Sequence, residues 1–125
     1  MPKKSIGAKV WLIPDSYLPT RHSGEIESHE TVCVLNLSRR PAKLKFTFYF
    51  EDRAPIRGCE ASCPPERTMH IPVKRLKGSK GESIPLGKSM AYLVESNVKV
   101  VVQHTRVDSS QPALALMTTM GFPVK

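Results

Sequence analysis

The stretch Ser96-Asn-Val-Lys-Val-Val-Val-Gln-His-Thr-Arg-Val-Asp108 is rich in valine and ends in polar side chains. Valine favours β-strands, in which successive side chains point to opposite faces. One face of this strand carries Val98, Val100, Val102, His104 and Arg106, and the other carries Lys99, Val101, Gln103, Thr105 and Val107. Because both faces are partly apolar, we expect a central strand that is covered on both sides and has a functional polar end. His104 and Arg106 can share a pocket with Gln103 and Thr105 only if a bulge intervenes.

Polar residues also open a second predicted strand, Ser28–Leu37, which begins with His29, Glu30 and Thr31. Antiparallel pairing would place the start of this strand beside the end of the valine strand. We therefore predict one polar cluster at one end of the fold, where binding sites are often built. The predicted ligand-binding residues are Trp11, His29, Glu30, Thr31, Asn36, Gln103, His104, Thr105, Arg106 and Asp108.

The side chains of this cluster suit a hydroxyl-rich ligand. Arg106 and Glu30 can make charged or bidentate contacts, while His104 and Gln103 can orient a ligand through hydrogen bonds. Trp11 would form an apolar wall, although a single tryptophan is more often part of a core. The alternative for Arg106 and Glu30 is a structural ion pair at a subunit interface.

The rest of the chain predicts further short strands with turns between them. In the clearest one, Ala42–Glu51, four apolar residues point inward and alternate with outward ones: Leu44, Phe46, Phe48 and Phe50 against Lys43, Lys45, Thr47, Tyr49 and Glu51. A tight turn at Ser96-Asn97 would join a strand over Met90–Val94 to the valine strand as a hairpin. The other predicted strands are Lys9–Ile13, Cys59–Cys63 at a sheet edge, Thr68–Val73 and Ala113–Phe122. The predicted loops are Asp15–Ser28, Asp52–Gly58 and a flexible basic segment, Lys74–Lys88.

About eight short strands and no convincing helix predict an all-β fold. The 125 residues have the length of one domain that buries its own core without disulfides or metal. We therefore expect a single antiparallel β-sandwich or barrel over residues 1–125, with the sandwich favoured.

The formal net charge of +8 makes a polyanionic partner worth considering. The basic residues are spread, with local concentrations only at Lys3-Lys4, at Arg39-Arg40 and at Lys74, Arg75, Lys77 and Lys80. The last group is the largest. No helix-turn-helix, zinc-finger or aromatic-interleaved pattern accompanies them. These four residues are therefore candidate nucleic-acid contacts, but a solvated loop is the favoured interpretation.

Several features predict a cytoplasmic protein without a cofactor. No apolar run has the roughly 20 residues of a membrane-spanning helix, and no apolar signal-peptide core follows the charged start. The three cysteines do not form an even disulfide framework. Cys59 and Cys63 with His70 give only a weak zinc pattern, since a fourth ligand is missing.

Two blocks of the chain resemble the soluble sensory rhodopsin transducer family, whose first-described member partners a cyanobacterial rhodopsin. The blocks are Ser28–Asn36 and Ser96–Ser109, with Trp11 before them and Gln111 beyond. The resemblance runs from Trp11 to about Met120, while residues 39–88 match mainly in length and strand pattern.

This resemblance implies a β-sandwich, a homotetramer and no catalytic activity. It also implies binding of a small molecule, with sugars as the favoured class, and a role in signalling or regulation. DNA binding and docking on a membrane receptor are the alternatives. The residues agree with a binding protein, because no nucleophile–base pair and no flanking pair of carboxylates is evident.

Overall fold

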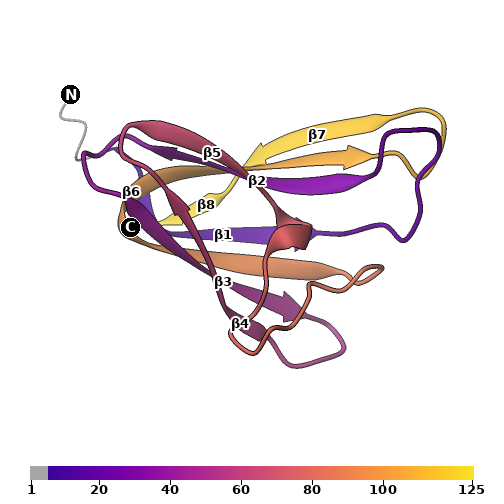
Figure 1. The fold of residues 1–125 in the computed structure, drawn as a ribbon, viewed down its shortest axis with the longest axis horizontal. Helices are drawn as coiled ribbons and strands as arrows, with labels where there is room; N and C mark the ends of the chain where they lie inside the picture. The colour runs from indigo at the N-terminus through magenta and orange to yellow at the C-terminus, as the bar shows by residue number, and fades with distance from the viewer. Residues whose placement is uncertain (1–5) are drawn as a thin grey trace.

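The computed structural model describes residues 6–125, and almost all of its regular secondary structure is β-strand (Figure 1). The charged start of the chain, on which the expectation about a signal peptide rests, lies mostly outside the described residues. The strands are β1 (Ala8–Ser16), β2 (His29–Asn36), β3 (Ala42–Phe50), β4 (Ile56–Cys63), β5 (Arg67–Pro72), β6 (Met90–Asp108), β7 (Ala115–Met120) and β8 (Phe122–Val124). A 3-10 turn, η2 (Val73–Arg75), follows β5.

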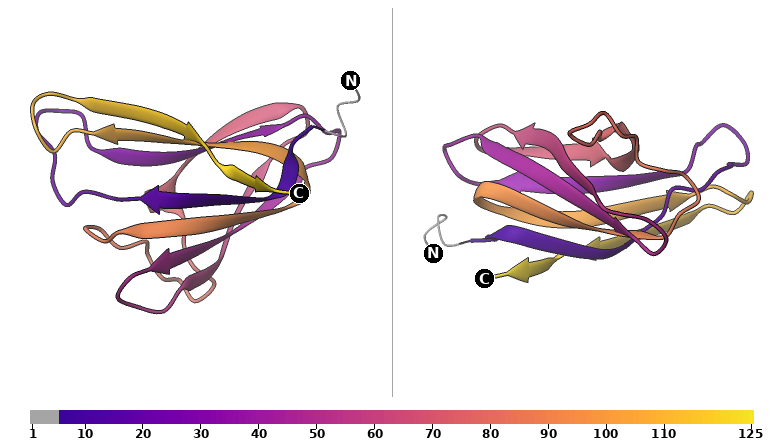
Figure 2. Two further views of the ribbon diagram at one scale, coloured as in Figure 1. Left: turned by 180° about the vertical axis from the view of Figure 1, so that it is seen from behind. Right: turned by 90° about the horizontal axis from the view of Figure 1, so that it is seen from below.

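Two antiparallel layers share the long strand β6. Sheet A has the order β4-β3-β6-β1-β8, and sheet B has the order β5-β2-β6-β7. In the ribbon views β6 leaves one layer and enters the other (Figures 1 and 2). This arrangement confirms the predicted all-β antiparallel sandwich and the central place of the valine strand.

The predicted turn at Ser96-Asn97 is wrong, because β6 is one continuous strand of 19 residues. Its first half pairs with β1 and β3, and its second half pairs with β2 and β7. Between the halves the β1 register jumps from Val10↔Glu95 to Ala8↔Val100. Asn97 accepts a hydrogen bond at Oδ1 from the Lys43 backbone N–H at 2.7 Å. The polar pair therefore marks the irregularity where the strand changes sheets.

The core lies between the inner faces of the two sheets. Leu44, Phe46 and Phe48 are buried as predicted, and Phe50 is partly buried. Thr47 is also buried, contrary to the prediction, at the place where the β3–β4 register shifts.

Several predicted boundaries also change. β1 continues through Pro14 to Ser16, since the short β8 ends its pairing at Leu12 and Pro14 faces no ladder partner on that side. β4 starts at Ile56, inside the predicted turn, and its pairing with β3 alone among the described strands agrees with the predicted edge position.

The predictions for the two remaining segments have different outcomes. The Lys74–Lys88 segment was expected to be flexible, but buried Leu76 and Ile84 anchor it to the core. The predicted strand over Ala113–Phe122 is confirmed as β7, which Gly121 separates from β8.

Candidate functional site

The two polar segments meet as predicted. Antiparallel pairing of β2 with β6 places Glu30 opposite Arg106 and Thr31 opposite Thr105. No register shift interrupts this pairing, so side-chain alternation separates the predicted cluster into two groups. Glu30, His104 and Arg106 lie on the inner side of sheet B, and Thr31, Gln103 and Thr105 lie on its outer side.

Glu30 is the centre of the inner group and is only 1% exposed. Arg106 donates from Nε and Nη2 to both carboxylate oxygens at 3.0–3.2 Å. The Tyr17 backbone N–H donates to Oε1 at 2.8 Å, and the Ser16 hydroxyl donates to the same oxygen at 3.2 Å. His104 Nε2 lies 3.1 Å from Oε1. These contacts occupy the carboxylate, which makes Glu30 a structural ion-pair partner.

The network continues into the core through His104 and Tyr92. The Tyr92 hydroxyl lies 2.7 Å from His104 Nδ1, and both side chains are buried. A neutral imidazole that accepts from Tyr92 at Nδ1 and donates to Glu30 from Nε2 satisfies both neighbours. Burial raises the pKa of Tyr92 well above its ordinary value, so the phenol stays protonated.

Opposing effects set the charge of Glu30. Burial raises its pKa, but hydrogen bonds from His104, Arg106 and Tyr17 outweigh burial, and the pKa lies below its ordinary value. The carboxylate is therefore charged and is balanced by Arg106. Arg106 is 24% exposed and reaches the surface, where Nη2 lies 3.4 Å from Asp15 Oδ2.

Three other predicted site residues lie outside both groups, and a fourth, His29, lies on the outer side of sheet B with Thr31. Trp11 is buried, and its indole N–H donates to Ala8 and Val100 carbonyls. Buried Asn36 donates to the carbonyls of three neighbouring residues. Asp108 accepts from the hydroxyl and backbone N–H of Ser110, which lowers its pKa. His29 lies beside the Glu27 carbonyl. That residues of the predicted set contact a ligand therefore stays a prediction.

Among the residues that pair in sheet B, none on the outer side is Asp, Glu, Lys or Arg, and Lys99, on the same side of β6, lies just before the first paired residue, Val101. We call this surface the neutral face. It consists of Thr68, His70 and Pro72 on β5; His29, Thr31, Cys33 and Leu35 on β2; Val101, Gln103, Thr105 and Val107 on β6; and Leu116, Thr118 and Met120 on β7. The outer side of sheet A, by contrast, carries Lys45, Glu60 and Glu95 in one row. In a chain with 24% charged residues, a four-stranded surface without them indicates a contact surface.

A depression of about 320 Å³ lies in the neutral face. Its lining includes Gln103, His70 and Thr68, whose polar side chains make no hydrogen bond to any described residue. Thr105 Oγ1 lies 3.7 Å from Cys33 Sγ. Gln103 and Thr105 belong to the predicted set, whereas Thr68 and Cys33 were missed and His70 was considered only as a metal ligand. The alternation of apolar and polar side chains over Thr68–Val73 could have indicated this position, because it places His70 on the face opposite the apolar residues of that strand.

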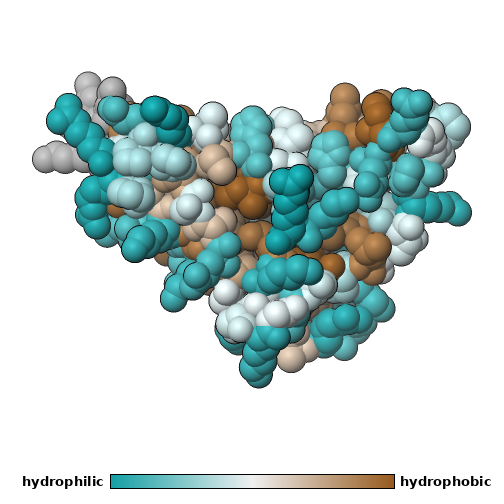
Figure 3. All heavy atoms as spheres, viewed as in Figure 1, coloured by the Kyte–Doolittle hydropathy of each residue, from teal (hydrophilic) through white to brown (hydrophobic). Residues whose placement is uncertain are grey.

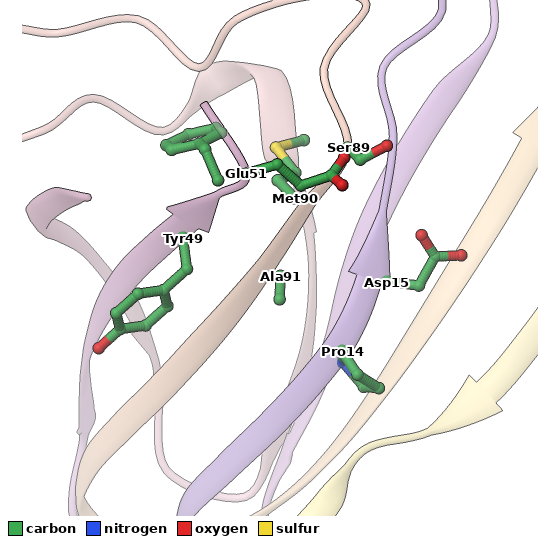
Figure 4. Close-up of a pocket in the computed structure, with 8 residues that line it drawn as sticks. Pro14, Asp15, Tyr49, Glu51, Ser89, Met90 and Ala91 are labelled. Carbon is green, nitrogen blue, oxygen red and sulfur yellow. The ribbon is translucent and has the colours of Figure 1, made fainter. Parts of the chain in front are cut away.

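A second depression, of about 410 Å³, lies over the start of β6 (Figure 4). Its lining includes Asp15, Glu51 and the ring of Tyr49. In Figure 4 Tyr49 and Asp15 point in opposite directions. The aromatic ring and the carboxylates therefore do not converge on one position, and this hollow is a weaker ligand site.

The candidate nucleic-acid contacts are partly engaged within the chain. Lys74 forms an ion pair with Glu27 at 2.9 Å, and Lys77 donates to the Ser83 hydroxyl at 2.7 Å. Arg75 and Lys80 are exposed beside them. The structure thus gives a mixed-charge surface at Lys74 rather than a continuous basic one.

Cys59 and Cys63 are buried free thiols, and His70 lies on the opposite, outer side of the fold. Burial raises the pKa of the Cys59 thiol to about 11. Within residues 6–125, no three His, Cys, Asp or Glu side chains are grouped as metal ligands.

A two-sheet β fold by itself does not define a function, and the features that distinguish this chain are the saturated internal ion pair and the uncharged outer surface of sheet B. Comparison identifies its family: the chain belongs to the family described as Anabaena sensory rhodopsin transducer, whose model matches residues 6–123. This match confirms the resemblance predicted from the sequence and relates the chain to signal transducers.

Solved structures agree with this assignment. A crystal structure of Thermotoga maritima 1070 is 34% identical with a TM-score of 0.82, covering 95% of this chain and 97% of that one. The Anabaena sensory rhodopsin transducer is 37% identical with a TM-score of 0.74, covering 86% of this chain and 95% of that one. A search of curated proteins finds no match. Residues 6–125 contain no helix of the length and hydropathy needed to cross a membrane.

Proposed function

We propose that the chain is a non-enzymatic signalling protein that binds a neutral, hydroxyl-rich small molecule, such as a sugar, in the depression of the neutral face. The observation that carries this proposal is the group of unpartnered polar side chains at Gln103, His70 and Thr68 on a surface without formal charge. An amide, an imidazole and hydroxyls donate to and accept from sugar hydroxyls. Leu35, Val101 and Met120 in the same depression supply an apolar floor.

The internal network supports a binding role rather than catalysis. Glu30 accepts from four neighbours and is sealed from solvent, so it has no free position for a substrate proton. In this proposal Glu30, His104 and Arg106 hold β2 against β6 beneath the depression. They position the outer residues Gln103 and Thr105 through the strands that they join.

In this proposal the protein acts in the cytoplasm as a closed homo-oligomer, and the expected form is a homotetramer. One related structure is named as the transducer of a sensory rhodopsin. For this chain we propose a receptor as a signalling partner, with the ligand as the input. DNA binding is the weaker alternative, because Lys74 is already paired with Glu27.

A panel of sugars and polyols should raise the melting temperature of the wild-type chain. Ligand at about 100 times Kd stabilises a folded protein by about 2.7 kcal/mol, which is readily measured. Gln103→Ala and Thr105→Val should weaken the binding at least about tenfold, by roughly 1.4 kcal/mol. Titration calorimetry with the sugar that gives the largest shift measures the loss.

The matched control is Gln111→Ala, which removes the same amide from an exposed loop outside the neutral face. It should leave both affinity and stability unchanged. Absence of any sugar or polyol shift would contradict the proposal. Salt-sensitive binding of a DNA duplex at the same time would favour the alternative.

A further inference from the structure

We infer that a hollow at the start of β1 binds a small molecule that carries a phosphate group, through the side chains of Lys9, Lys99 and Lys125. The hollow has a volume of about 320 Å³, and we call it the lysine hollow. It shares no lining residue with the depression in the neutral face. The phosphate-bearing ligand is therefore additional to the proposed sugar and does not depend on it. The lining consists of Gly7, Ala8, Lys9, Lys99, Val124 and Lys125.

The pairing of β1 with β6 brings two of the lysines together. Ala8 pairs with Val100, so antiparallel alignment places the next residue of β1, Lys9, beside Lys99. The register between the two strands shifts directly after this position. The lysines therefore lie at the irregularity where β6 passes from one sheet to the other, and both side chains are exposed.

The third lysine reaches the same hollow from the other side of β1. Strand β8 pairs with β1 up to Val10↔Val124, and Lys125 is the next residue. Its Nζ donates to the Gly7 carbonyl at 3.5 Å. In the ribbon views the end of β8 lies beside the start of β1 (Figures 1 and 2). Three neighbouring strands thus place one lysine each around a single hollow.

The positive charge around the lysine hollow is not balanced by carboxylates. None of the ion pairs within residues 6–125 includes any of the three lysines. In the outer row of sheet A, by contrast, Lys45 pairs with Glu60 on one side and Glu95 on the other. Like charges side by side on neighbouring strands are destabilising. A bound anion would remove this repulsion, whereas the free protein has to tolerate it.

The size and lining of the hollow favour a phosphate monoester. Ammonium groups bind phosphate oxygens as point charges, and three of them offset the roughly two negative charges of a phosphate monoester. The volume of the hollow lies at the lower end of the range for small-molecule sites, which is roughly 300–1,000 Å³. Ala8 and Val124 give apolar contacts to the organic part of such a molecule.

The surroundings of the hollow argue against a nucleic acid as the source of the phosphate. A duplex is contacted at several phosphates along a basic patch or stripe. Beyond Lys99, the outer residues of β6 belong to the uncharged neutral face. Beside Lys9, Val10 pairs with Glu95. The positive charge is therefore confined to one hollow, which suits a compact anion.

Lys99→Gln combined with Lys125→Gln should weaken the binding of phenyl phosphate at least about tenfold, because two charged hydrogen-bond donors are lost. Titration calorimetry at constant ionic strength measures the affinity. Inorganic phosphate should bind wild type more weakly than phenyl phosphate, since it has no organic part. Equal affinities for the two probes would overturn the assignment to a small organic molecule.

The matched control is Arg53→Gln combined with Lys88→Gln, which removes the same number of positive charges. Both residues pair with Asp52 near the start of β6, and neither lines the lysine hollow. This variant should keep the wild-type affinity for phenyl phosphate. An equal loss in both double variants would show a general effect of net charge and overturn the site.

Melting temperatures show whether the lysine variant loses the site or only its folding. Without phenyl phosphate the Lys99→Gln, Lys125→Gln protein should melt above wild type, because a repulsion is relieved. Saturating phenyl phosphate should raise the melting temperature of wild type but not that of the variant. A lower melting temperature of the variant without ligand would contradict the repulsion on which the inference rests.

Two further outcomes decide how this inference stands beside the proposed function. A wild-type protein that does not bind phenyl phosphate would overturn the inference, as would tighter binding of a DNA duplex that the same two substitutions abolish. A protein that binds phenyl phosphate but no sugar would support the lysine hollow and contradict only the proposed sugar site.

Discussion

Replacing Arg106 with methionine should lower the free energy of unfolding by about 3–5 kcal/mol, because it leaves the Glu30 carboxylate charged and buried. Arg106 provides the cation that balances this carboxylate, with contacts at 3.0–3.2 Å. Glu30 cannot turn toward water, since it is enclosed between β1, β2 and β6. Urea unfolding of the variant and the wild type measures the difference.

The partner substitution, Glu30→Gln, should cost less, about 1–3 kcal/mol. Arg106 is partly exposed and can remain charged beside Asp15. The double variant should be less destabilised than the sum of the two single ones, because the residues are in direct contact. Equal losses in both single variants, or simple additivity, would contradict the asymmetric burial on which this prediction depends.

Acid should weaken the same interaction. The pKa of Glu30 is lowered in the folded protein from its ordinary value of 4.5. A lowered pKa contributes stability above the unfolded value, and this contribution is lost as the pH falls through the folded value. Wild type should therefore lose stability below about pH 4.5 faster than Glu30→Gln does. Parallel pH profiles for the two proteins would show that Glu30 does not contribute in this way.

Local sequence patterns predicted the features of the fold that depend on the residues of a single strand. The alternation over Ala42–Phe50 identified the inner face of β3 because a half-buried strand needs apolar residues at every second position. The Ser96-Asn97 pair failed for the opposite reason. A polar pair between apolar runs favours a turn locally, but Asn97 is satisfied by the Lys43 backbone, which is distant in the sequence. Such long-range pairing has no local signal.

The candidate site shows the same division. Side-chain alternation along β6 correctly placed His104 and Arg106 on the opposite face from Gln103 and Thr105. The prediction of a single polar cluster did not take this alternation into account. No feature of the sequence indicated that Tyr92 belongs to the site, because its contact with His104 depends on the passage of β6 from one sheet to the other. The depression depends on β5 lying beside β2, and strand order cannot be read from alternation.

Trp11 was predicted as an apolar wall for a ligand, and the structure places its indole between the two sheets. Its N–H lies 3.0 Å from the carbonyl oxygens of both Ala8 and Val100 and so joins β1 to the second half of β6. A Cβ added at Gly121 would lie 3.1 Å from the Trp11 ring. The ring therefore packs against the crossing from β7 to β8 as well as against β6.

Trp11→Ala should lower the free energy of unfolding by about 3–5 kcal/mol, because it removes a buried aromatic side chain and leaves a cavity. Trp11→Phe keeps most of the packing but loses the N–H donor, and it should cost about 1–3 kcal/mol. Thermal unfolding followed by circular dichroism suits both variants, since Trp11 is the single tryptophan. The phenylalanine variant should keep wild-type affinity for a sugar bound at the proposed site on the neutral face, because Trp11 does not line that depression. Loss of sugar binding in a stable Trp11→Phe protein would instead show that the indole contacts the ligand, as the sequence first indicated.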